Sequence, residues 1–189
     1  MDLFQTLLLG SILVPSIGSL AILFFFLSDK VKAVKIAYFA FGFPCIAGIV
    51  LFYNFDPSNT GYAYQILYER MGLQSLGITF HLGLNGVSAP LFAMAGFVGL
   101  AAGLAAIKSG ADRLPLYLSL LAFMQSGLMG LFASIDLLFY YLFHEFALIP
   151  TFLMIGLWGG RDRRSIALEI TIYLTLGALV SLGGLVALN

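Results

Sequence analysis

The stretch DLLFYYLFHEFALIPTFLMIGLWGGRDRR, Asp136 to Arg164, decides the fold class of this 189-residue chain. Before its closing arginines it is apolar over the roughly 20 residues that a helix needs to cross the hydrocarbon of a membrane. Two residues near the middle, His144 and Glu145, interrupt the apolar run. The segment predicts a transmembrane helix over residues 137–158, with a carboxylate at a depth where charge is expensive.

The composition of the whole chain indicates an integral membrane protein. Hydrophobic residues make up 61% of the sequence and charged residues 10%, whereas about a quarter of the residues in a soluble domain are charged. The formal net charge is +0, and the sequence has no basic patch of the kind that neutralises nucleic-acid phosphates. We therefore expect most of the chain to lie in a lipid bilayer, and we expect no nucleic acid among its binding partners.

Further apolar windows of similar length lie on both sides of this segment. Together they predict an all-α, polytopic bundle with six transmembrane helices at about residues 3–27, 34–53, 86–107, 114–133, 137–158 and 165–188. The long connection 54–85 is expected to be an external loop that ends in a short strand, SLGITFHLGLNG. Asn85 is expected to cap the helix that follows, because its side-chain oxygen can accept from the first turn. A single transmembrane domain, residues 1–189, is predicted.

The basic residues are distributed asymmetrically between the connections. Eight of the nine Lys and Arg residues follow the first, third and fifth predicted helices: Lys30, Lys32, Lys35, Lys108, Arg113, Arg161, Arg163 and Arg164. Arg70 is the ninth, in the long connection. Because basic connections stay on the cytoplasmic side, we predict an N-terminus outside and a multi-pass location in the cytoplasmic (inner) membrane of a bacterium.

Glu145 is the principal candidate for a functional residue. It lies eight residues after Leu137, about 12 Å into the predicted helix. A charge at that depth costs at least about 2.5 to 3.5 kcal/mol, so the carboxylate should face the bundle interior and have a partner. Pro150 removes the N–H that would bond the carbonyl of Phe146, and that carbonyl could hold water. These features predict a proton relay at Glu145; a carboxylate that only fixes helix packing is the alternative.

His144 is a second possible proton relay, since an unperturbed imidazole titrates near neutral pH. Neighbouring helical residues point about 100° apart, so His144 need not share a face with Glu145, and it could instead sit neutral against another helix. The sequence contains no phosphate loop, dinucleotide fingerprint, nucleophile elbow or cluster of metal ligands. Its single cysteine, Cys45, offers no iron–sulfur motif, so neither a metal nor a cofactor site is expected in this chain.

Two segments carry a resemblance to a known family. ASIDLLFYYLFHEFALIPTFLMIGLWGG (133–160) and HLGLNGVSAPLF (81–92) resemble the M subunit of proton-translocating NADH:quinone oxidoreductase, the antiporter-like membrane subunit of respiratory complex I. The most specific part of the match is Glu145, Pro150 and Trp158 in the first segment. The resemblance implies that Glu145 is the family's essential glutamate, which in the intact subunit pairs with a lysine on a later helix.

The resemblance also implies a function and a set of partners. The chain would contribute part of a proton channel coupled to electron transfer from NADH to quinone. NADH, FMN, the iron–sulfur clusters and quinone would bind other subunits, and neighbouring antiporter-like subunits would be its main partners. The family's subunit has more helices than the six predicted here, so the chain is expected to be its N-terminal portion.

Three positions depart from the family: Asn85 stands where members often have an acidic residue, His144 where they have an aromatic one, and Glu169 near where they have a basic one. Two other classes of protein remain alternatives. The first is a subunit of a multisubunit cation/proton antiporter or of a membrane-bound hydrogenase, whose related subunits share the glutamate. The second is a membrane anchor that transports nothing.

Overall fold

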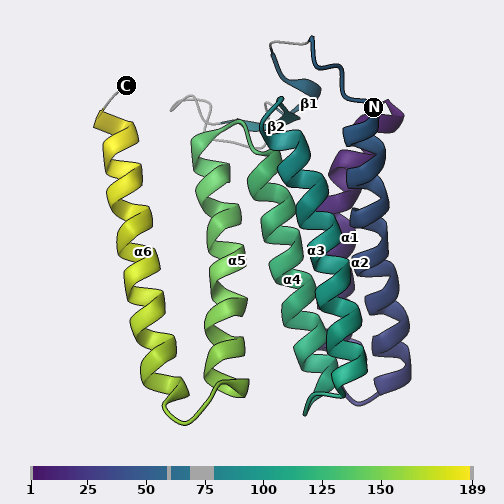
Figure 1. The fold of residues 1–189 in the computed structure, drawn as a ribbon, viewed down its shortest axis with the longest axis vertical. Coiled ribbons are helices and arrows are strands. Elements are labelled where there is room, and N and C mark those ends of the chain that lie inside the picture. Colours follow the sequence, from purple (N-terminus) through teal and green to yellow (C-terminus); the bar gives the residue numbers. More distant parts are fainter. Residues whose placement is uncertain (1, 59–60, 69–78, 188–189) are drawn as a thin grey trace.

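The computed structural model describes residues 2–58, 61–68 and 79–187. Within them the chain forms a helical bundle with a small hairpin at one end (Figure 1). The elements are α1 (Leu3–Phe25), α2 (Lys30–Tyr53), β1 (Ala63–Tyr68), β2 (Phe80–Leu84), α3 (Ser88–Ser109), α4 (Leu114–Ala133), α5 (Leu137–Trp158) and α6 (Arg163–Ala187). All six helices are long and apolar enough to cross a membrane, so the predicted bundle of six spans is confirmed.

The helix α2 begins at Lys30, earlier than the predicted start near residue 34. Asp29 caps it: the backbone N–H of Lys32 donates to the Asp29 carboxylate at 3.1 Å, and the Lys32 ammonium lies 3.1 Å from the same group. A hydropathy window stops at charged residues, whereas a capped helix can extend through them into the membrane surface. The backbone and ammonium of Lys32 hold the pKa of the Asp29 carboxyl below its usual range.

The connection between α2 and α3 is more ordered than the predicted loop. Strand β1 pairs antiparallel with β2, in a register that places Ala63 opposite Leu84 and Leu67 opposite His81. The expectation of a short strand before α3 is confirmed over β2, while its partner strand β1 was not predicted. Arg70 and the rest of 69–78 lie outside the described residues.

The hairpin is fastened to the bundle through β2. The side chains of Leu82 and Leu84 are 0% exposed and pack in the apolar core at that end. The backbone N–H of Ile135, between α4 and α5, donates to the carbonyl of His81 at 2.9 Å. The hairpin therefore fixes where the chain leaves α4 and enters α5.

Serine side chains join α1 to α4 inside the bundle. The Ser119 hydroxyl donates to the backbone carbonyl of Ser19 at 2.9 Å, and the Ser126 hydroxyl donates to the carbonyl of Ile12 at 2.8 Å. Small residues let helix backbones approach closely, and in hydrocarbon a hydroxyl needs a protein partner because water is absent. We call this set of contacts the serine seam.

The helices differ in how much of their surface the rest of the chain covers. Within the candidate spans, 56% of the residues of α4 are buried, against 17% in α5 and 6% in α6. Figure 1 shows the reason: α1 to α4 form one group, α5 lies along its edge, and α6 lies outermost beside α5. The apolar faces of α5 and α6 are therefore the most exposed helical surfaces of the described chain.

The two ends of the bundle carry different features. The N-terminus and the hairpin lie at one end, while the connections after α1, α3 and α5 lie at the other (Figure 1). Those three connections hold or border the eight basic residues named above. The predicted separation of basic and non-basic connections is thus present in the fold.

Candidate functional site

Asp136 sets the start of α5. Its carboxylate accepts from the backbone N–H of Leu138 at 2.9 Å and from that of Phe139 at 3.4 Å. The N–H of Thr79, just before β2, donates to the same side chain at 3.3 Å. A carboxylate at this position satisfies free N–H groups and is stabilised by the positive end of the helix dipole.

Two glycines of α4 bring α5 into close contact. A Cβ on Gly127 would lie 2.7 Å from the backbone nitrogen of Ala147 and 2.9 Å from the carbonyl oxygen of Phe143. A Cβ on Gly130 would overlap the ring of Phe143. The face of α5 that includes Phe143 and Ala147 therefore packs directly on α4.

Glu145 does not lie on that face. It follows Phe143 by two residues, so it points about 200° around the helix from it. Its side chain is half-buried, and within the described residues it makes no hydrogen bond or ion pair. The structure thus places the carboxylate in mid-helix and away from α4, and the described residues do not include the partner that the sequence led us to expect.

Pro150 is buried in the contact with α4, and α5 continues through it. The proline has no N–H to donate to the carbonyl of Phe146, one residue after Glu145. The neighbouring hydroxyl of Thr151 donates to the carbonyl of Ala147 at 2.8 Å. The missing N–H of Pro150 next to Glu145 thus lies inside a continuous helix, as the sequence predicted.

His144 faces α6 across a small cavity. The cavity has a volume of about 100 Å³ and is lined by Tyr140, Tyr141, His144, Ala178 and Ser181. The Tyr141 hydroxyl donates to the carbonyl of Ala178 at 2.6 Å and so joins the two helices. In the described chain the buried Nδ1 of His144 has no hydrogen-bond partner. Buried polar atoms nearly always have one, and this cavity has room for water.

Other polar residues of α6 differ from their predicted surroundings. Because Glu169 lies one turn into α6, near Arg163 and Arg164, the sequence predicts that it pairs with the basic connection before α6. In the described residues the hydroxyl of Ser165 donates to Glu169 at 3.3 Å, and no arginine forms an ion pair with it. That prediction is wrong for the described residues, where the Arg163 guanidinium donates to the carbonyl of Leu157 at 2.7 Å instead. The spacing of Gly177, Ser181 and Gly184 predicts that another helix approaches closely, yet no atom of the described residues lies within 4 Å of a Cβ placed on either glycine.

Sequence reasoning missed two contributors to this region. The position of Tyr141 near the end of the predicted helix 137–158 suggests an interfacial aromatic residue, but its hydroxyl ties α5 to α6. The glycines Gly127 and Gly130 were not singled out, although their spacing of one helical turn inside an apolar span is a recognisable signal of close helix packing.

No family model matches the chain, but two relatives and one solved structure are similar to it. The chain is 33% identical to NADH-quinone oxidoreductase subunit M of Rickettsia felis, over 93% of this chain and 36% of that protein. It is 33% identical to NAD(P)H-quinone oxidoreductase chain 4 3 of Picosynechococcus sp., over 72% of this chain and 24% of that protein. It therefore spans about a third or less of these relatives.

A solved structure shares the fold. The membrane-bound sulfane sulfur reductase, an archaeal respiratory membrane complex, superposes with a TM-score of 0.65 at 19% identity, over 91% of this chain and 26% of the matched chain. The resemblance predicted from the segments 81–92 and 133–160 is confirmed by the two sequence relatives.

Proposed function

We propose that this chain, which is related to subunit M of NADH-quinone oxidoreductase, forms part of a proton-translocating membrane subunit and that Glu145 is its proton relay. The observation that carries the proposal is the position of Glu145: mid-span in α5, half-buried, and without a partner in the described residues. An ionisable group at such depth is costly, and such groups usually mark an ion or proton path.

Glu145 would act by exchanging a proton with water and a neighbouring cation. A carboxyl group is neutral when it holds the proton, and it releases the proton when a positive group approaches, because an opposite charge favours the charged form. The carbonyl of Phe146, without the N–H of Pro150, would hold a water molecule beside the carboxyl group. The family resemblance supplies the cation as a lysine of a later helix.

The sites for the substrates and redox cofactors would lie on other subunits of the complex. NADH, FMN, the iron–sulfur clusters and quinone would bind partner chains, and the exposed faces of α5 and α6 would meet further transmembrane helices of the complex. We propose a bacterial inner membrane as the location, with the N-terminus and hairpin outside and the basic connections in the cytoplasm. Labelling of a cysteine introduced at Asn54 from the cytoplasmic side would contradict this orientation.

The test uses the assembled complex that contains this chain. We expect Glu145→Gln to lower the initial rate of NADH-driven proton translocation by about a hundredfold, as for the loss of a positioned acid–base group, while Glu145→Asp keeps part of it. Inverted membrane vesicles with a pH-sensitive dye report the rate. Glu169→Gln is the matched control, because Glu169 is an exposed carboxylate near the membrane surface.

The same experiment separates the alternatives. Full pumping by Glu145→Gln in an intact complex would leave Glu145 with a packing role and favour a membrane anchor. Sodium-dependent transport without NADH oxidation would favour a cation/proton antiporter.

His144 is proposed as an accessory group of the same path. We expect His144→Phe to lower pumping only partly, because Glu145 remains and the phenyl ring fills the same space without offering nitrogen atoms to water. If His144→Phe pumps like the unmodified protein while Glu145→Gln does not, His144 is a packing residue.

A further inference from the structure

A groove runs along the outside of α4 and α5 towards the basic end of the bundle. It has a volume of about 410 Å³, and its walls are mainly the side chains of Tyr117, Met124, Met154, Ile155 and Trp158. The one hydroxyl of a serine or threonine in its wall, that of Thr151, is already bound to the carbonyl of Ala147. We call this feature the α4–α5 groove; its lining suits a hydrocarbon chain.

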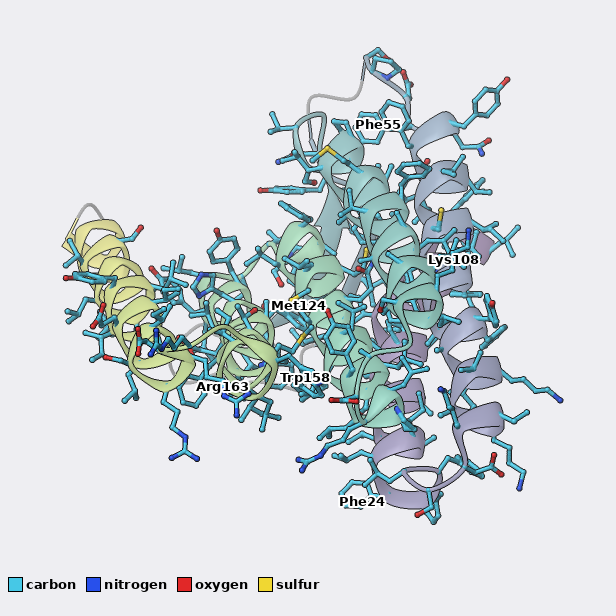
Figure 2. The ribbon with its side chains drawn as sticks, turned by 60° about the horizontal axis from the view of Figure 1, so that its bottom comes forward. Phe24, Phe55, Lys108, Met124, Trp158 and Arg163 are labelled. Atoms are coloured by element: carbon cyan, nitrogen blue, oxygen red, sulfur yellow. The ribbon has the colours of Figure 1, made fainter. Side chains whose placement is uncertain are left out.

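The length of the groove fits part of a fatty-acyl chain. Thr151 and Trp158 are seven residues apart on α5, a rise of about 10 Å, which accommodates several methylene groups. Met124 and Trp158 both lie between α4 and α5 in the view from the basic end (Figure 2). Trp158 stands at the mouth, with its ring edge-on to that of Tyr117 at 5.1 Å between centroids. Its indole N–H donates to the carbonyl of Asp112 at 2.8 Å, which holds the ring in place.

A second cavity continues from the mouth of the groove into charged surroundings. It has a volume of about 250 Å³, shares Trp158 with the groove, and is lined by Arg113 and Arg163 together with Asp112 and Leu157. One N–H of the Arg163 guanidinium donates to the carbonyl of Leu157 at 2.7 Å, and a guanidinium has further donors to offer. Within the described chain neither arginine forms an ion pair.

The backbone at Arg113 is unusual. Its φ of 55° lies in the left-handed region, which non-glycine residues occupy at a cost and which clusters at binding and active sites. Arg113 immediately precedes α4, and its carbonyl accepts from the N–H of Tyr117 at 3.1 Å. The start of α4 thus holds one guanidinium beside the mouth of the groove, while the start of α6 holds that of Arg163.

We propose that the α4–α5 groove and the adjoining arginine cavity form a binding site for one anionic glycerophospholipid. Its phosphate pairs with Arg113 and Arg163, whose planar guanidinium groups match phosphate oxygens. One acyl chain passes Trp158 into the groove. The charge at the mouth selects an anionic headgroup, and the apolar wall requires the acyl chain, so a free phosphate would leave the groove unfilled. This inference does not depend on the proposed proton path.

Trp158 provides the assay, because it is the chain's single tryptophan. The 189-residue chain is reconstituted in phosphatidylcholine vesicles, and brominated phosphatidylglycerol or brominated phosphatidylcholine is added at equal mole fractions. Bromine atoms quench indole fluorescence on contact. We expect phosphatidylglycerol to show an apparent affinity for the site about fivefold higher per participating arginine, and the preference to shrink as salt is raised.

Substitutions test where the preference arises. Arg113→Gln combined with Arg163→Gln should remove it and leave quenching by brominated phosphatidylcholine unchanged, and the matching Arg→Lys pair should retain part of it. Lys30→Gln combined with Lys35→Gln is the matched control, since both lysines lie at the same end of the bundle on another helix. Circular dichroism of each variant verifies equal helix content.

Three outcomes would overturn the proposal. Equal quenching by the two brominated lipids would mean that the site does not select charge. A preference that is lost equally in the lysine control would reflect the general surface charge of the basic end. Competition by soluble glycerophosphoglycerol as effective as that by the lipid would identify an anion site with no acyl-chain component.

Discussion

The helices α1 to α4 differ from α5 in whether their polar side chains have hydrogen-bond partners within the described chain. In α1 to α4 these groups bind neighbouring helices: the serine seam joins α1 to α4, and the Gln125 amide donates to the carbonyl of Ala95 in α3 at 3.1 Å. In α5, Glu145 has no partner within the described chain, and the buried Nδ1 of His144 has none either. Buried polar groups of the first region thus contribute to packing, whereas α5 combines one such contact, from Tyr141 to the carbonyl of Ala178, with two polar groups that have no partner in the described chain.

The difference follows from the membrane environment. Lipid tails are as apolar as Leu, so helices in a bilayer associate through close contact and hydrogen bonds, and α1 to α4 have both. An unsatisfied polar group in hydrocarbon costs free energy, so Glu145 and the Nδ1 of His144 in α5 are costly to retain and are candidates for a function. We infer that α1 to α4 are a scaffold and that α5 carries the function.

The largest expected effect comes from filling the contact between the two regions. Gly127→Leu would place a side chain where the α5 backbone lies, so we expect it to lower the free energy of unfolding by about 3 kcal/mol. Gly177→Leu on α6 meets open space and should change it by less than about 0.5 kcal/mol. Unfolding by SDS titration measures both. Equal effects of the two substitutions would contradict the proposed boundary between scaffold and functional region.

A smaller effect is expected from the serine seam. Ser119→Ala removes the hydrogen bonds of that hydroxyl with the carbonyl and the hydroxyl of Ser19, and Ser126→Ala removes those with the carbonyl of Ile12 and the hydroxyl of Ser16. Hydrogen bonds between helices contribute about 0.6 to 1.7 kcal/mol each in membranes. The exposed Ser165→Ala should stay within about 0.5 kcal/mol of the unmodified protein. The same titration provides the comparison. If Ser165→Ala lowered the free energy of unfolding as much as the seam substitutions do, polar contacts in the two regions would contribute equally to stability, contrary to this comparison.

The smallest expected effect concerns the cap of α2. The pKa of the Asp29 carboxyl is lowered from its usual value of 3.8 by the Lys32 backbone N–H and ammonium. A lowered pKa means that the cap stabilises the folded state at pH values above 3.8 and that this contribution is lost as the pH falls through the lowered pKa. An NMR titration of the Asp29 carboxyl carbon, followed with the Lys32 amide, should show a midpoint below 3.8. Asp29→Asn should remove the change at the Lys32 amide, and a midpoint at or above 3.8 would refute the cap.

Several local features could be predicted because they depend on neighbouring residues alone. Residues 114–133 and 137–158 were predicted as helices and form α4 and α5 with the same bounds. Asn85 accepts from the backbone N–H of Ser88 at 2.8 Å, as expected for the cap before α3. Asp136 caps α5 in the same way. Apolar length and cap chemistry act within a few residues, so sequence reveals both.

Features that depend on distant segments could not be predicted in this way. Strand β1 forms only because β2 and the top of the bundle lie beside it. Glu169 lies near three arginines in the sequence, yet the residue that donates a hydrogen bond to it is Ser165. Tyr141 looks like any interfacial aromatic residue until α6 brings the carbonyl of Ala178 within reach.

The sequence by itself determined that this is a multi-pass membrane protein, where its spans lie, and that Glu145 lies in the middle of one of them. The reason is that the hydrophobic effect and the cost of charge in a membrane depend on composition along the chain. Only the tertiary structure decided which face of α5 meets α4, that Glu145 points away from that face, and that Trp158 joins an apolar groove to a pair of arginines. Those facts depend on how helices pack, which glycine contacts and interhelical hydrogen bonds between distant residues determine.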